Sequence, residues 1–434
     1  MIGHDRAVRH TRRGGRRGGA IGRAVLLAGA ILGGPLLAGG PADEWRSWRG
    51  PTGNNHAAAT ATAPLSTAAA TVRWQVPIPG RGHGSPIVVG DLVVVPTADT
   101  RAGEQRVLAF NKADGTPRFD TLIHKGRLPT ENHPNNTEAS CTCASNGRLI
   151  FCAFYNADAI MLTALTLDGK EAWQANLGPY TLDVYRYGYA ASPVLYKDSV
   201  IVVADMDGAS FLCARDQATG RELWRTPRHG RLTFSSPIVA RTGGRDQLVL
   251  SGGGSVVSYD PDTGKKLWTS AALPTATCGT MVWNDKCVFG SGGYPQSQTA
   301  AIATDGSGRV VWSNAVKCYE QSLLVVGDYV YAVADTGVAH CWRAADGREM
   351  WKARLGGKSS ASPLLVGDTI HILDEGGNWI AFKADPARLT VVARSRLGDE
   401  AFATPAVVGD TMYVRYADSG DGPRQEHLAA LTSK

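Results

Sequence analysis

The chain has 434 residues, 43% of them hydrophobic, and a formal net charge of +6. Residues 1 to 42 hold seven arginines and one aspartate, so this segment carries the whole excess charge and the remainder is neutral. A neutral remainder has no basic patch of the kind that binds nucleic acid, so no nucleic-acid partner is expected.

Residues 1 to 42 are predicted to be an export signal peptide. Arginines run from Arg6 to Arg23, an apolar stretch AVLLAGAILGGPLLAG follows, and the small residues Gly40-Pro41-Ala42 mark a cleavage site. The apolar stretch is short and interrupted by glycine and proline, so no membrane span is expected after processing. We expect the mature chain in the periplasm or outside the cell, with Sec and twin-arginine export both left open.

Residues 43 to 71 are predicted to form an N-terminal segment and a linker, and residues 72 to 434 a single domain. The stretch AAATATAPLSTAAAT, residues 57 to 71, consists mostly of alanine and threonine. This composition gives little reason to expect packing.

From residue 72 onward, a tight-turn signal recurs between short apolar runs. Glycine, asparagine and aspartate tolerate the positive φ that a two-residue hairpin turn requires, so each signal predicts a β-hairpin. The eight turns are Gly90-Asp91, Asn146-Gly147, Lys197-Asp198, Arg245-Asp246, Asn284-Asp285, Gly327-Asp328, Gly367-Asp368 and Gly409-Asp410.

Six of the units also contain a glycine that precedes an aromatic residue by four positions. These aromatic residues are 39 to 54 positions apart, and they are Phe119, Trp173, Trp224, Trp268, Trp312 and Trp351. A period near 40 to 50 residues is typical of propeller blades. Each unit therefore reads as one four-stranded antiparallel blade, and the aromatic residues are predicted to pack blades together.

The count of strands predicts how the ring closes. The seventh unit has a degenerate outer strand, LTVVARSRL at 389 to 397, and the eighth unit ends before any outer strand. The segment VRWQVPI at 72 to 78, with Trp74 as its packing residue, is predicted to supply the missing strand. The predicted fold is an all-β, eight-bladed β-propeller closed by the N-terminal strand, which leaves no open sheet edge.

The cysteine spacing predicts one disulfide bond. If Asn146-Gly147 is a two-residue hairpin loop, Cys141 faces Cys152 on the same side of the sheet, and Cys143 stays free. Directly opposed strand positions bring two Cβ atoms within disulfide range. An exported protein permits such a bond.

Three of the repeat units resemble the tryptophan-docking repeats of pyrroloquinoline-quinone-type (PQQ-like) β-propellers. They are DPDTGKKLW (260 to 268), DQATGRELW (216 to 224) and AADGREMW (344 to 351), and the whole of residues 72 to 434 fits the pattern. The motif is specific for this superfamily but says almost nothing about function.

Three further stretches resemble exported bacterial propellers of this type whose activity is not established. They are WRSWRGPTG (45 to 53), HPNNTEAS (133 to 140) and RDQLVLSGGGSVVSYDPDTG (245 to 264).

The resemblance implies two functional branches. One consists of non-catalytic propellers similar to the outer-membrane β-barrel assembly lipoprotein, which bind other proteins. The other consists of quinoprotein alcohol and sugar dehydrogenases, which hold PQQ and calcium on the ring axis beside a disulfide of adjacent cysteines. No two cysteines are adjacent in this sequence, so no catalytic residue is carried over and no cofactor is expected.

We therefore expect an exported, non-catalytic propeller that binds or scaffolds a protein of the cell envelope. Two alternatives stay open: a divergent oxidoreductase that depends on PQQ and calcium, and an envelope protein that binds polysaccharide. Fold alone does not decide among them.

A binding site is expected on one face of the ring, in the irregular loops that lead into the innermost strands. These loops are rich in tyrosine and carry charges of both signs, which suits contacts with protein or carbohydrate. In the alternative interpretation, the loops only plug the mouth of the channel. The candidate residues are His83, Glu138, Tyr185, Tyr187, Tyr189, Phe234, Tyr319, Glu320, Lys358, Glu400 and Phe402. His124 and His133 lack further ligands nearby, so no metal site is expected.

Overall fold

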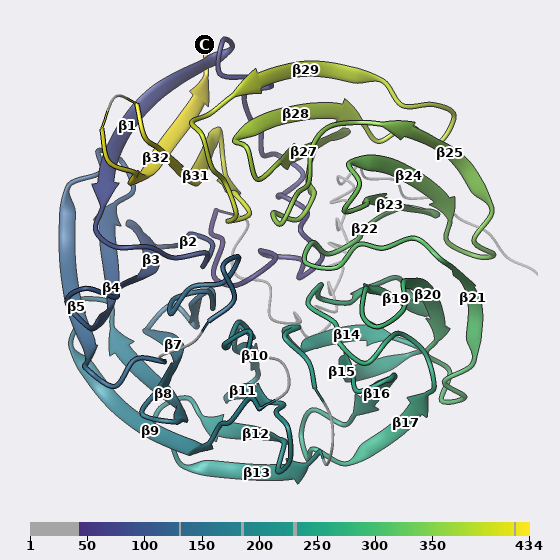
Figure 1. Cartoon of the computed structure of the whole chain (residues 1–434), viewed down its shortest axis with the longest axis horizontal. Helices are drawn as coiled ribbons and strands as arrows, with labels where there is room; N and C mark the ends of the chain where they lie inside the picture. Colours follow the sequence, from purple (N-terminus) through teal and green to yellow (C-terminus); the bar gives the residue numbers. More distant parts are fainter. Residues whose placement is uncertain (1–42, 130–131, 184–185, 229–231, 421) are drawn as a thin grey trace, which may run out of the picture. The chain divides into compact units, whose positions relative to one another are not determined.

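The protein is an eight-bladed β-propeller. Its structure, a computed structural model, describes residues 43–129, 132–183, 186–228, 232–420 and 422–434. Within these residues the chain forms 32 strands and no helix, in eight four-stranded antiparallel sheets around one axis (Figure 1). The predicted fold class is confirmed. The predicted signal peptide, residues 1 to 42, lies outside the described residues.

The strands of each blade follow one another from the axis outward, except in the last blade. Blades 1 to 4 are β2(Ile87–Val89), β3(Leu92–Asp99), β4(Glu104–Asn111), β5(Pro117–Lys125); β6(Ala144–Ser145), β7(Leu149–Asn156), β8(Ala159–Thr166), β9(Glu171–Pro179); β10(Val194–Tyr196), β11(Ser199–Ala204), β12(Phe211–Asp216), β13(Glu222–Pro227); β14(Ile238–Thr242), β15(Arg245–Gly252), β16(Ser255–Tyr259), β17(Lys266–Ser270). Blades 5 to 8 are β18(Val282–Trp283), β19(Cys287–Gly292), β20(Gln298–Ala303), β21(Val310–Asn314); β22(Leu324–Val326), β23(Tyr329–Val333), β24(Val338–Arg343), β25(Glu349–Arg354); β26(Leu364–Val366), β27(Thr369–Leu373), β28(Asn378–Lys383), β29(Val391–Arg396); β30(Ala406–Val408), β31(Thr411–Asp418), β32(Gln425–Ser433), β1(Ala70–Ile78).

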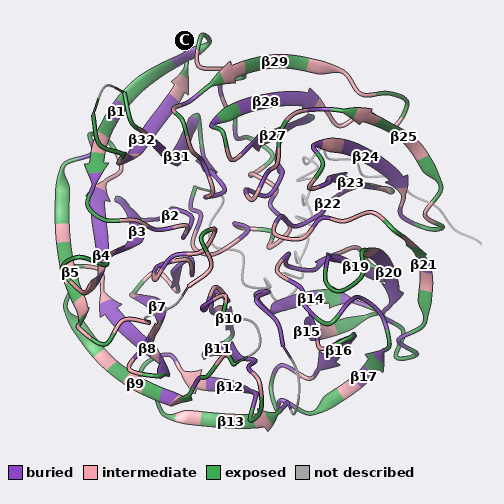
Figure 2. Ribbon diagram, in the orientation of Figure 1, coloured by how far each residue is buried: buried purple, intermediate pink, exposed green. Residues whose placement is uncertain are grey.

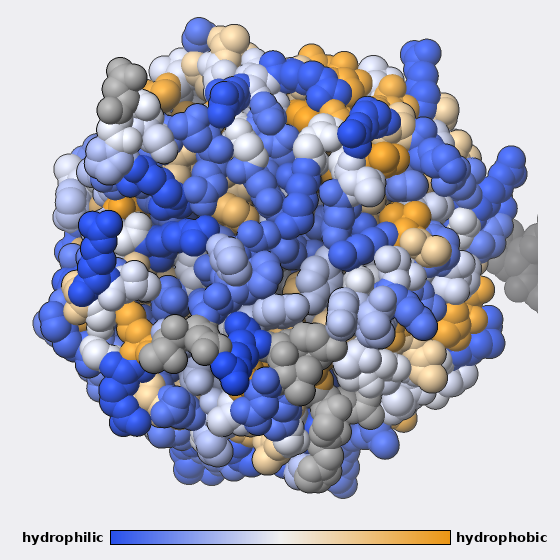
Figure 3. Space-filling model, viewed as in Figure 1, coloured by the Kyte–Doolittle hydropathy of each residue, from blue (hydrophilic) through white to orange (hydrophobic). Residues whose placement is uncertain are grey.

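Burial falls from the axis to the rim, as Figure 2 shows. The second strands are apolar runs buried on both faces, because neighbouring blades cover them; β11 and β27 are buried at every position. The outer strands have one solvent face, so β13 and β29 alternate between half-buried and exposed residues. On the face drawn in Figure 3, hydrophilic residues cover most of the middle. No described segment forms a helix that is long and apolar enough to span a membrane.

The last blade is closed by the start of the domain. Strand β1 pairs antiparallel with β32, from Ala70 opposite Ser433 to Ile78 opposite Glu426, with a bulge between Val72 and Trp74. The predicted closure is confirmed, and the strand begins two residues earlier than the sequence indicated. The last blade therefore has four strands like the other seven, with β1 as its outermost strand.

Six of the seven outer-strand aromatic rings lie against a glycine of the following blade, and the seventh, Trp351, faces a turn without glycine. A Cβ atom added at Gly115, where φ is +74°, would lie 2.8 Å from the Trp74 ring, and the same contact joins Phe119 to Gly169. The contact repeats from Trp173 to Gly220, Trp224 to Gly264, Trp268 to Gly308 and Trp312 to Gly347. Only glycine combines this backbone conformation with so close an approach. The spacing of four residues thus repeats because one unit contains both a glycine that is covered by the preceding blade and an aromatic ring that covers the following blade.

The indole N–H groups add a polar contact to this packing. Trp74, Trp173, Trp312 and Trp351 each donate to a backbone carbonyl of the next blade, on Lys112, Gln217, Ala344 and Asp385 respectively, at 2.8–3.0 Å. A buried indole N–H requires such a partner.

Blade 7 lacks the aromatic ring, and the closure of the ring explains why. Its outer strand carries Ala393 opposite Ala381, the position that Trp351 occupies opposite Cys341 in blade 6. In blade 8, β32 and β1 are the two ends of the domain, so the glycine turn that a ring would cover does not exist. Here Thr67 N donates to Ser395 Oγ at 3.0 Å instead.

The closure predicts a stability cost for Trp74→Ala. Trp74 is buried and covers both the Gly115 turn and Tyr413, whose ring centroid is 6.0 Å away. Loss of a buried aromatic side chain costs about 3–5 kcal/mol, and chemical denaturation would measure it. Val72→Ala is the matched control, because Val72 lies in the same strand with 55% of its surface exposed. Equal midpoints for parent and Trp74→Ala would contradict this account of closure.

Candidate functional site

A cavity of about 210 Å³ lies on the propeller axis. All eight blades line it through a buried serine or threonine that stands just before the innermost strand. These residues are Ser85, Thr142, Ser192, Ser236, Thr280, Ser322, Ser362 and Thr404. We call them the hydroxyl ring.

The hydroxyl ring joins neighbouring blades by hydrogen bonds. At seven positions the backbone N–H of one member donates to the side-chain oxygen of the member in the next blade, at 2.9–3.0 Å. The last of these bonds runs from Thr404 to Ser85 and so passes across the ends of the domain. Each bond satisfies a backbone donor that would otherwise be buried without a partner.

The eighth position is occupied differently. Among the described residues, Ser236 is the one ring member whose N–H does not reach the next hydroxyl. The oxygen of that hydroxyl, Thr280 Oγ1, accepts instead from Trp48 Nε1 at 2.9 Å. Trp48 precedes the propeller in the sequence, so a segment outside the repeats completes the ring.

Trp48 belongs to the N-terminal strap, which we define as residues 43–62. The strap crosses the middle of the ring before the chain runs outward to β1, as the purple trace in Figure 1 shows. Trp45 exchanges two 2.9 Å backbone bonds with Val88 of β2, and Ala57 N donates to Leu365 O of β26 at 2.9 Å. The strap therefore lies on the face that carries the inner hairpin turns.

The strap corrects one expectation. We expected little packing from residue 57 onward, but Ala61 is buried and Thr62 N donates to Gly409 O at 2.8 Å. Small residues suit this position because the strap lies close to the inner strands. A second cavity, of about 220 Å³, lies between the strap and blades 3 and 4. Trp48 lines both cavities and separates them.

The opposite end of the axial cavity opens among the loops that lead into the inner strands. Six of the candidate residues line it: His83, Tyr187, Phe234, Tyr319, Glu320 and Phe402. The rings of His83 and Phe402 stack with centroids 4.1 Å apart, and those of Tyr187 and Phe234 lie 5.4 Å apart. We call this set of loops the cavity mouth.

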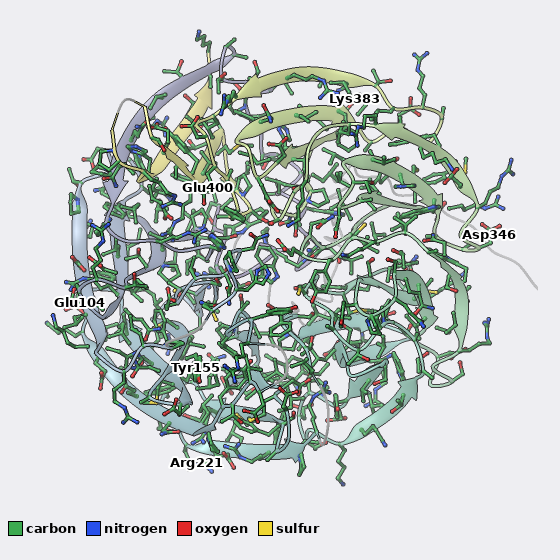
Figure 4. All side chains as sticks on the ribbon, viewed as in Figure 1. Glu104, Tyr155, Arg221, Asp346, Lys383 and Glu400 are labelled. Carbon is green, nitrogen blue, oxygen red and sulfur yellow. The ribbon has the colours of Figure 1, made fainter. Side chains whose placement is uncertain are left out.

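Charged residues at the cavity mouth are paired. Lys358 Nζ lies 3.3 Å from Glu320 Oε1 and 2.9 Å from Glu375 Oε1, and the Ser360 hydroxyl lies within hydrogen-bond distance of both carboxylates and can donate to one of them. Glu400 pairs with Arg81 at 3.4 Å and with Arg424 at 2.7 Å. In Figure 4, Glu400 lies nearer the axis than Asp346, Arg221 and Glu104 at the rim. Pairing leaves little uncompensated charge over the cavity.

The burial of His83 changes its acid–base behaviour. Burial, with Arg81, Arg415 and Arg424 nearby, lowers the pKa of His83 well below its usual value. The imidazole is therefore neutral at pH 7, and one of its two nitrogens is a hydrogen-bond acceptor.

Two candidates lie elsewhere. The prediction that Tyr189 is an exposed contact residue is wrong. Tyr189 is 6% exposed, and its hydroxyl donates to Val203 O at 2.9 Å inside the core of blade 3. Glu138 lines a separate, small cavity that it shares with Tyr189. Tyr185 lies outside the described residues. His124 lies in the outer strand β5, and its ring forms a hydrogen bond with the side chain of Gln105 in β4. His133 lines the axial cavity.

The disulfide prediction is wrong in its register. Ser145 pairs with Ile150 and Ala144 with Phe151, so the hairpin loop has four residues, Asn146 to Leu149. Asn146 Oδ1 accepts from the backbone of Arg148 and Leu149, which stabilises this longer loop. Continued outward, the register places Cys143, not Cys141, opposite Cys152. All eight cysteines are free in the structure.

Cysteine exposure predicts the order of alkylation. Cys278 is half-buried and lines the axial cavity, whereas the other seven cysteines are buried. We expect maleimide to modify Cys278 first in the native protein, and the remaining thiols only after unfolding. Burial raises the pKa of Cys278, so the reaction is expected to be slow at neutral pH. Peptide mapping without reductant measures the order, and a Cys141–Cys152 peptide would contradict the observed register.

The hydroxyl ring and Trp48 were missed by the sequence-based reasoning, although a signal was present. A serine or threonine stands two positions before the start of every inner strand, and in five units proline follows it, as in Ser192-Pro193 and Thr404-Pro405. Nothing local marked Trp48, because its partner Thr280 lies 232 residues away.

The axial cavity does not fit a calcium-bound quinone. Among the described residues that line it, Glu320 is the only carboxylate, and Lys358 and Ser360 already engage that group. The same described lining holds no aspartate to act as a base, and Cys278 is its only cysteine. Within the described part of the chain, no group of three or more His, Cys, Asp or Glu residues is arranged to hold a metal ion.

Comparison with known proteins points to one family and one fold. A family model described as "Outer membrane protein assembly factor BamB" matches residues 50–179, 138–286 and 296–431. A protein of that name from Burkholderia pseudomallei is 25% identical over 316 residues, which cover 69% of this chain and 72% of the relative. A 1-butanol dehydrogenase (quinone) from Thauera butanivorans is 26% identical over 227 residues, which cover 49% of this chain and 33% of that enzyme.

Solved structures show the same architecture. BamB from Moraxella catarrhalis has a TM-score of 0.59 at 15% identity, covering 84% of this chain and 98% of that one. A europium-containing methanol dehydrogenase has a TM-score of 0.66 at 12% identity, covering 90% of this chain and 98% of that one. At such identities the likeness shows the fold alone.

Proposed function

The chain belongs to the family of the outer membrane protein assembly factor BamB, and from this premise we propose that it is a non-catalytic module of the cell envelope that captures another envelope protein. The names of its relatives describe outer membrane protein assembly factors, which supports a partner of this kind. The predicted signal peptide supports export of the mature chain.

The observation that carries the proposal is the one-sided access to the propeller axis. The strap covers the face of the inner hairpin turns, while the cavity mouth presents aromatic rings and paired charges on the other face. Aromatic residues within a polar rim are enriched in protein–protein interfaces. We therefore place the partner on the cavity mouth.

The chemistry of the mouth supports binding rather than catalysis. Glu320 and Glu375 share Lys358, and Glu400 is paired with two arginines, so these carboxylates are held as structural ions. A general acid or base needs a perturbed pKa and an unoccupied reactive group within reach of a substrate. None of these carboxylates is free in this way.

Capture of the partner should depend on Tyr187 and Lys358. Both lie at the mouth and are half-buried, so the double variant Tyr187→Ala, Lys358→Ala should fold while losing an aromatic anchor and a charge. Because interface tyrosines often contribute 2 kcal/mol or more, we expect affinity to fall about tenfold or more. The measurement is capture of the same envelope protein by tagged parent and variant, quantified by mass spectrometry.

The matched control is Asp346→Ala, Lys383→Ala, at the outer rim (Figure 4). It removes one acidic and one basic side chain far from the mouth. Unchanged capture by the mouth variant, or an equal loss in the rim variant, would place the partner elsewhere on the propeller.

Quinone-dependent oxidation is the second candidate, because part of the chain is similar to a quinone-dependent 1-butanol dehydrogenase. The donors that line the axial cavity do not suit calcium and a quinone. We expect no calcium-dependent quinone absorption band, and no dye reduction with 1-butanol or glucose, when the mature protein is mixed with PQQ and calcium chloride. Dye reduction that requires both additions would overturn the non-catalytic assignment.

A further inference from the structure

The axial cavity has binding chemistry of its own, which protein capture on the mouth does not use. We infer that the cavity binds a single neutral sugar residue, held by the hydroxyl ring and by two buried polar atoms that make no hydrogen bond in the described part of the chain. The sugar is either a free monosaccharide or the end of a glycan chain that enters through the mouth.

The hydroxyl ring supplies the donors. Each of its eight oxygens accepts one hydrogen bond, seven from backbone N–H groups of ring members and one from Trp48. Within the described residues, none of these hydroxyls has a protein acceptor for its own proton. All eight line the cavity, so they can donate into it. Because a hydroxyl proton rotates freely, the ring suits a ligand that carries several acceptors.

Two further atoms call for a partner. His83 Nε2 and Tyr319 Oη are buried and make no hydrogen bond in the described part of the chain, and both residues line the cavity. The Cys278 thiol lies beside Tyr319 Oη, but a thiol is a weak hydrogen-bond partner. The neutral imidazole of His83 offers an acceptor, and the Tyr319 phenol offers a donor. Buried polar atoms are normally satisfied, so a ligand or water must meet them.

A ligand that both donates and accepts at several points is a polyhydroxylated one. The wall also includes apolar ring surface from Trp48, Phe234 and Phe402, which suits the C–H faces of a sugar ring. The carboxylate of Glu320 is offset by Lys358, and burial raises the pKa values of Tyr319 and Cys278, so these groups stay protonated. A neutral wall favours a neutral ligand over a phosphate or a carboxylate.

Size limits the ligand to one residue. The cavity holds about 210 Å³, below the range of roughly 300–1,000 Å³ that is typical of pockets for drug-sized molecules. The strap closes its far end, so a longer glycan would have to extend outward through the mouth.

Calorimetric titration of the mature protein with four sugars tests the inference. The probes are D-glucose, N-acetyl-D-glucosamine, maltotriose and triacetylchitotriose, with sodium phosphate as a charged comparison. We expect saturable binding of at least one sugar and none of phosphate. Tighter binding of a trisaccharide than of its monosaccharide identifies a chain end as the source, and equal or exclusive binding of the monosaccharide identifies the free sugar.

Tyr319→Phe is the sharpest variant, because it removes only a hydroxyl that no hydrogen bond of the protein uses. Folding should be unchanged, while sugar affinity should fall about five- to tenfold, as expected for loss of one hydrogen bond. Tyr155→Phe is the matched control, since Tyr155 lies outside the axial cavity (Figure 4). As a second readout, the bound sugar should slow alkylation of Cys278, which lines the same cavity.

Three results would overturn the inference: no saturable binding of any of the four sugars, preferential binding of phosphate, or sugar binding that neither weakens in Tyr319→Phe nor protects Cys278. Tyr319→Phe separates these outcomes from protein capture, which is tested with Lys358 at the mouth and with Tyr187, a residue that also lines the cavity.

Discussion

Most blades of this propeller are held to the next one at two radii. At the rim, an aromatic ring lies on the glycine of the following blade, as Trp74 does on Gly115. Near the axis, a backbone N–H donates to the hydroxyl of the following blade, as Ser362 does to Thr404. The rim contact removes apolar surface from water, and the axial contact satisfies buried donors, so together they fix the angle between blades. The cavity exists because both contacts repeat around a closed circle.

The strap makes the two ends of the axial cavity different from each other. It pairs with the edges of the inner strands, and Trp48 fills the axis up to the level of the hydroxyl ring. A ring of identical blades would give a channel that is open at both faces. With the strap in place, the axial channel becomes a pocket with a floor and a mouth.

Features that repeat along the chain could be predicted from the sequence, because each copy of the repeat shows the same turns and packing residues at the same spacing. The Gly-Asp turns, the glycine–aromatic spacing and the missing eighth strand gave the blade number, the antiparallel order and the closure by the segment around Trp74. Six of the eleven candidate residues line one cavity, because the loops before the inner strands must all point to one face of a ring.

Features that depend on distant or non-repeated contacts could not be predicted in the same way. The strap looked like a linker because its partners are hundreds of residues away, as with Asn55 and Pro363. Tyr189 was misplaced because a loop sequence does not reveal which of its side chains turns back into the core. The hairpin around Asn146 was misread because the side chain of Asn146 stabilises a four-residue loop in place of the two-residue one.

Ala393 lies next to the blade in which the two ends of the propeller domain meet. Seven blades carry a tryptophan or phenylalanine at this position, and in six of them the ring covers a glycine turn of the next blade. Blade 8, which follows Ala393, has the two ends of the domain in place of that turn. The position of the termini is therefore encoded in the packing of the neighbouring blade as well as in the ends themselves. A circular permutant that joins Ser433 to Ala70 by a turn would have to bring back a glycine in that turn and an aromatic residue at 393. At the blade where the permutant has its new chain ends, the glycine of the turn and the aromatic residue that covers it would no longer be needed. The fold thus constrains the order of the blades less strongly than it constrains the match between each aromatic ring and the turn that the ring covers.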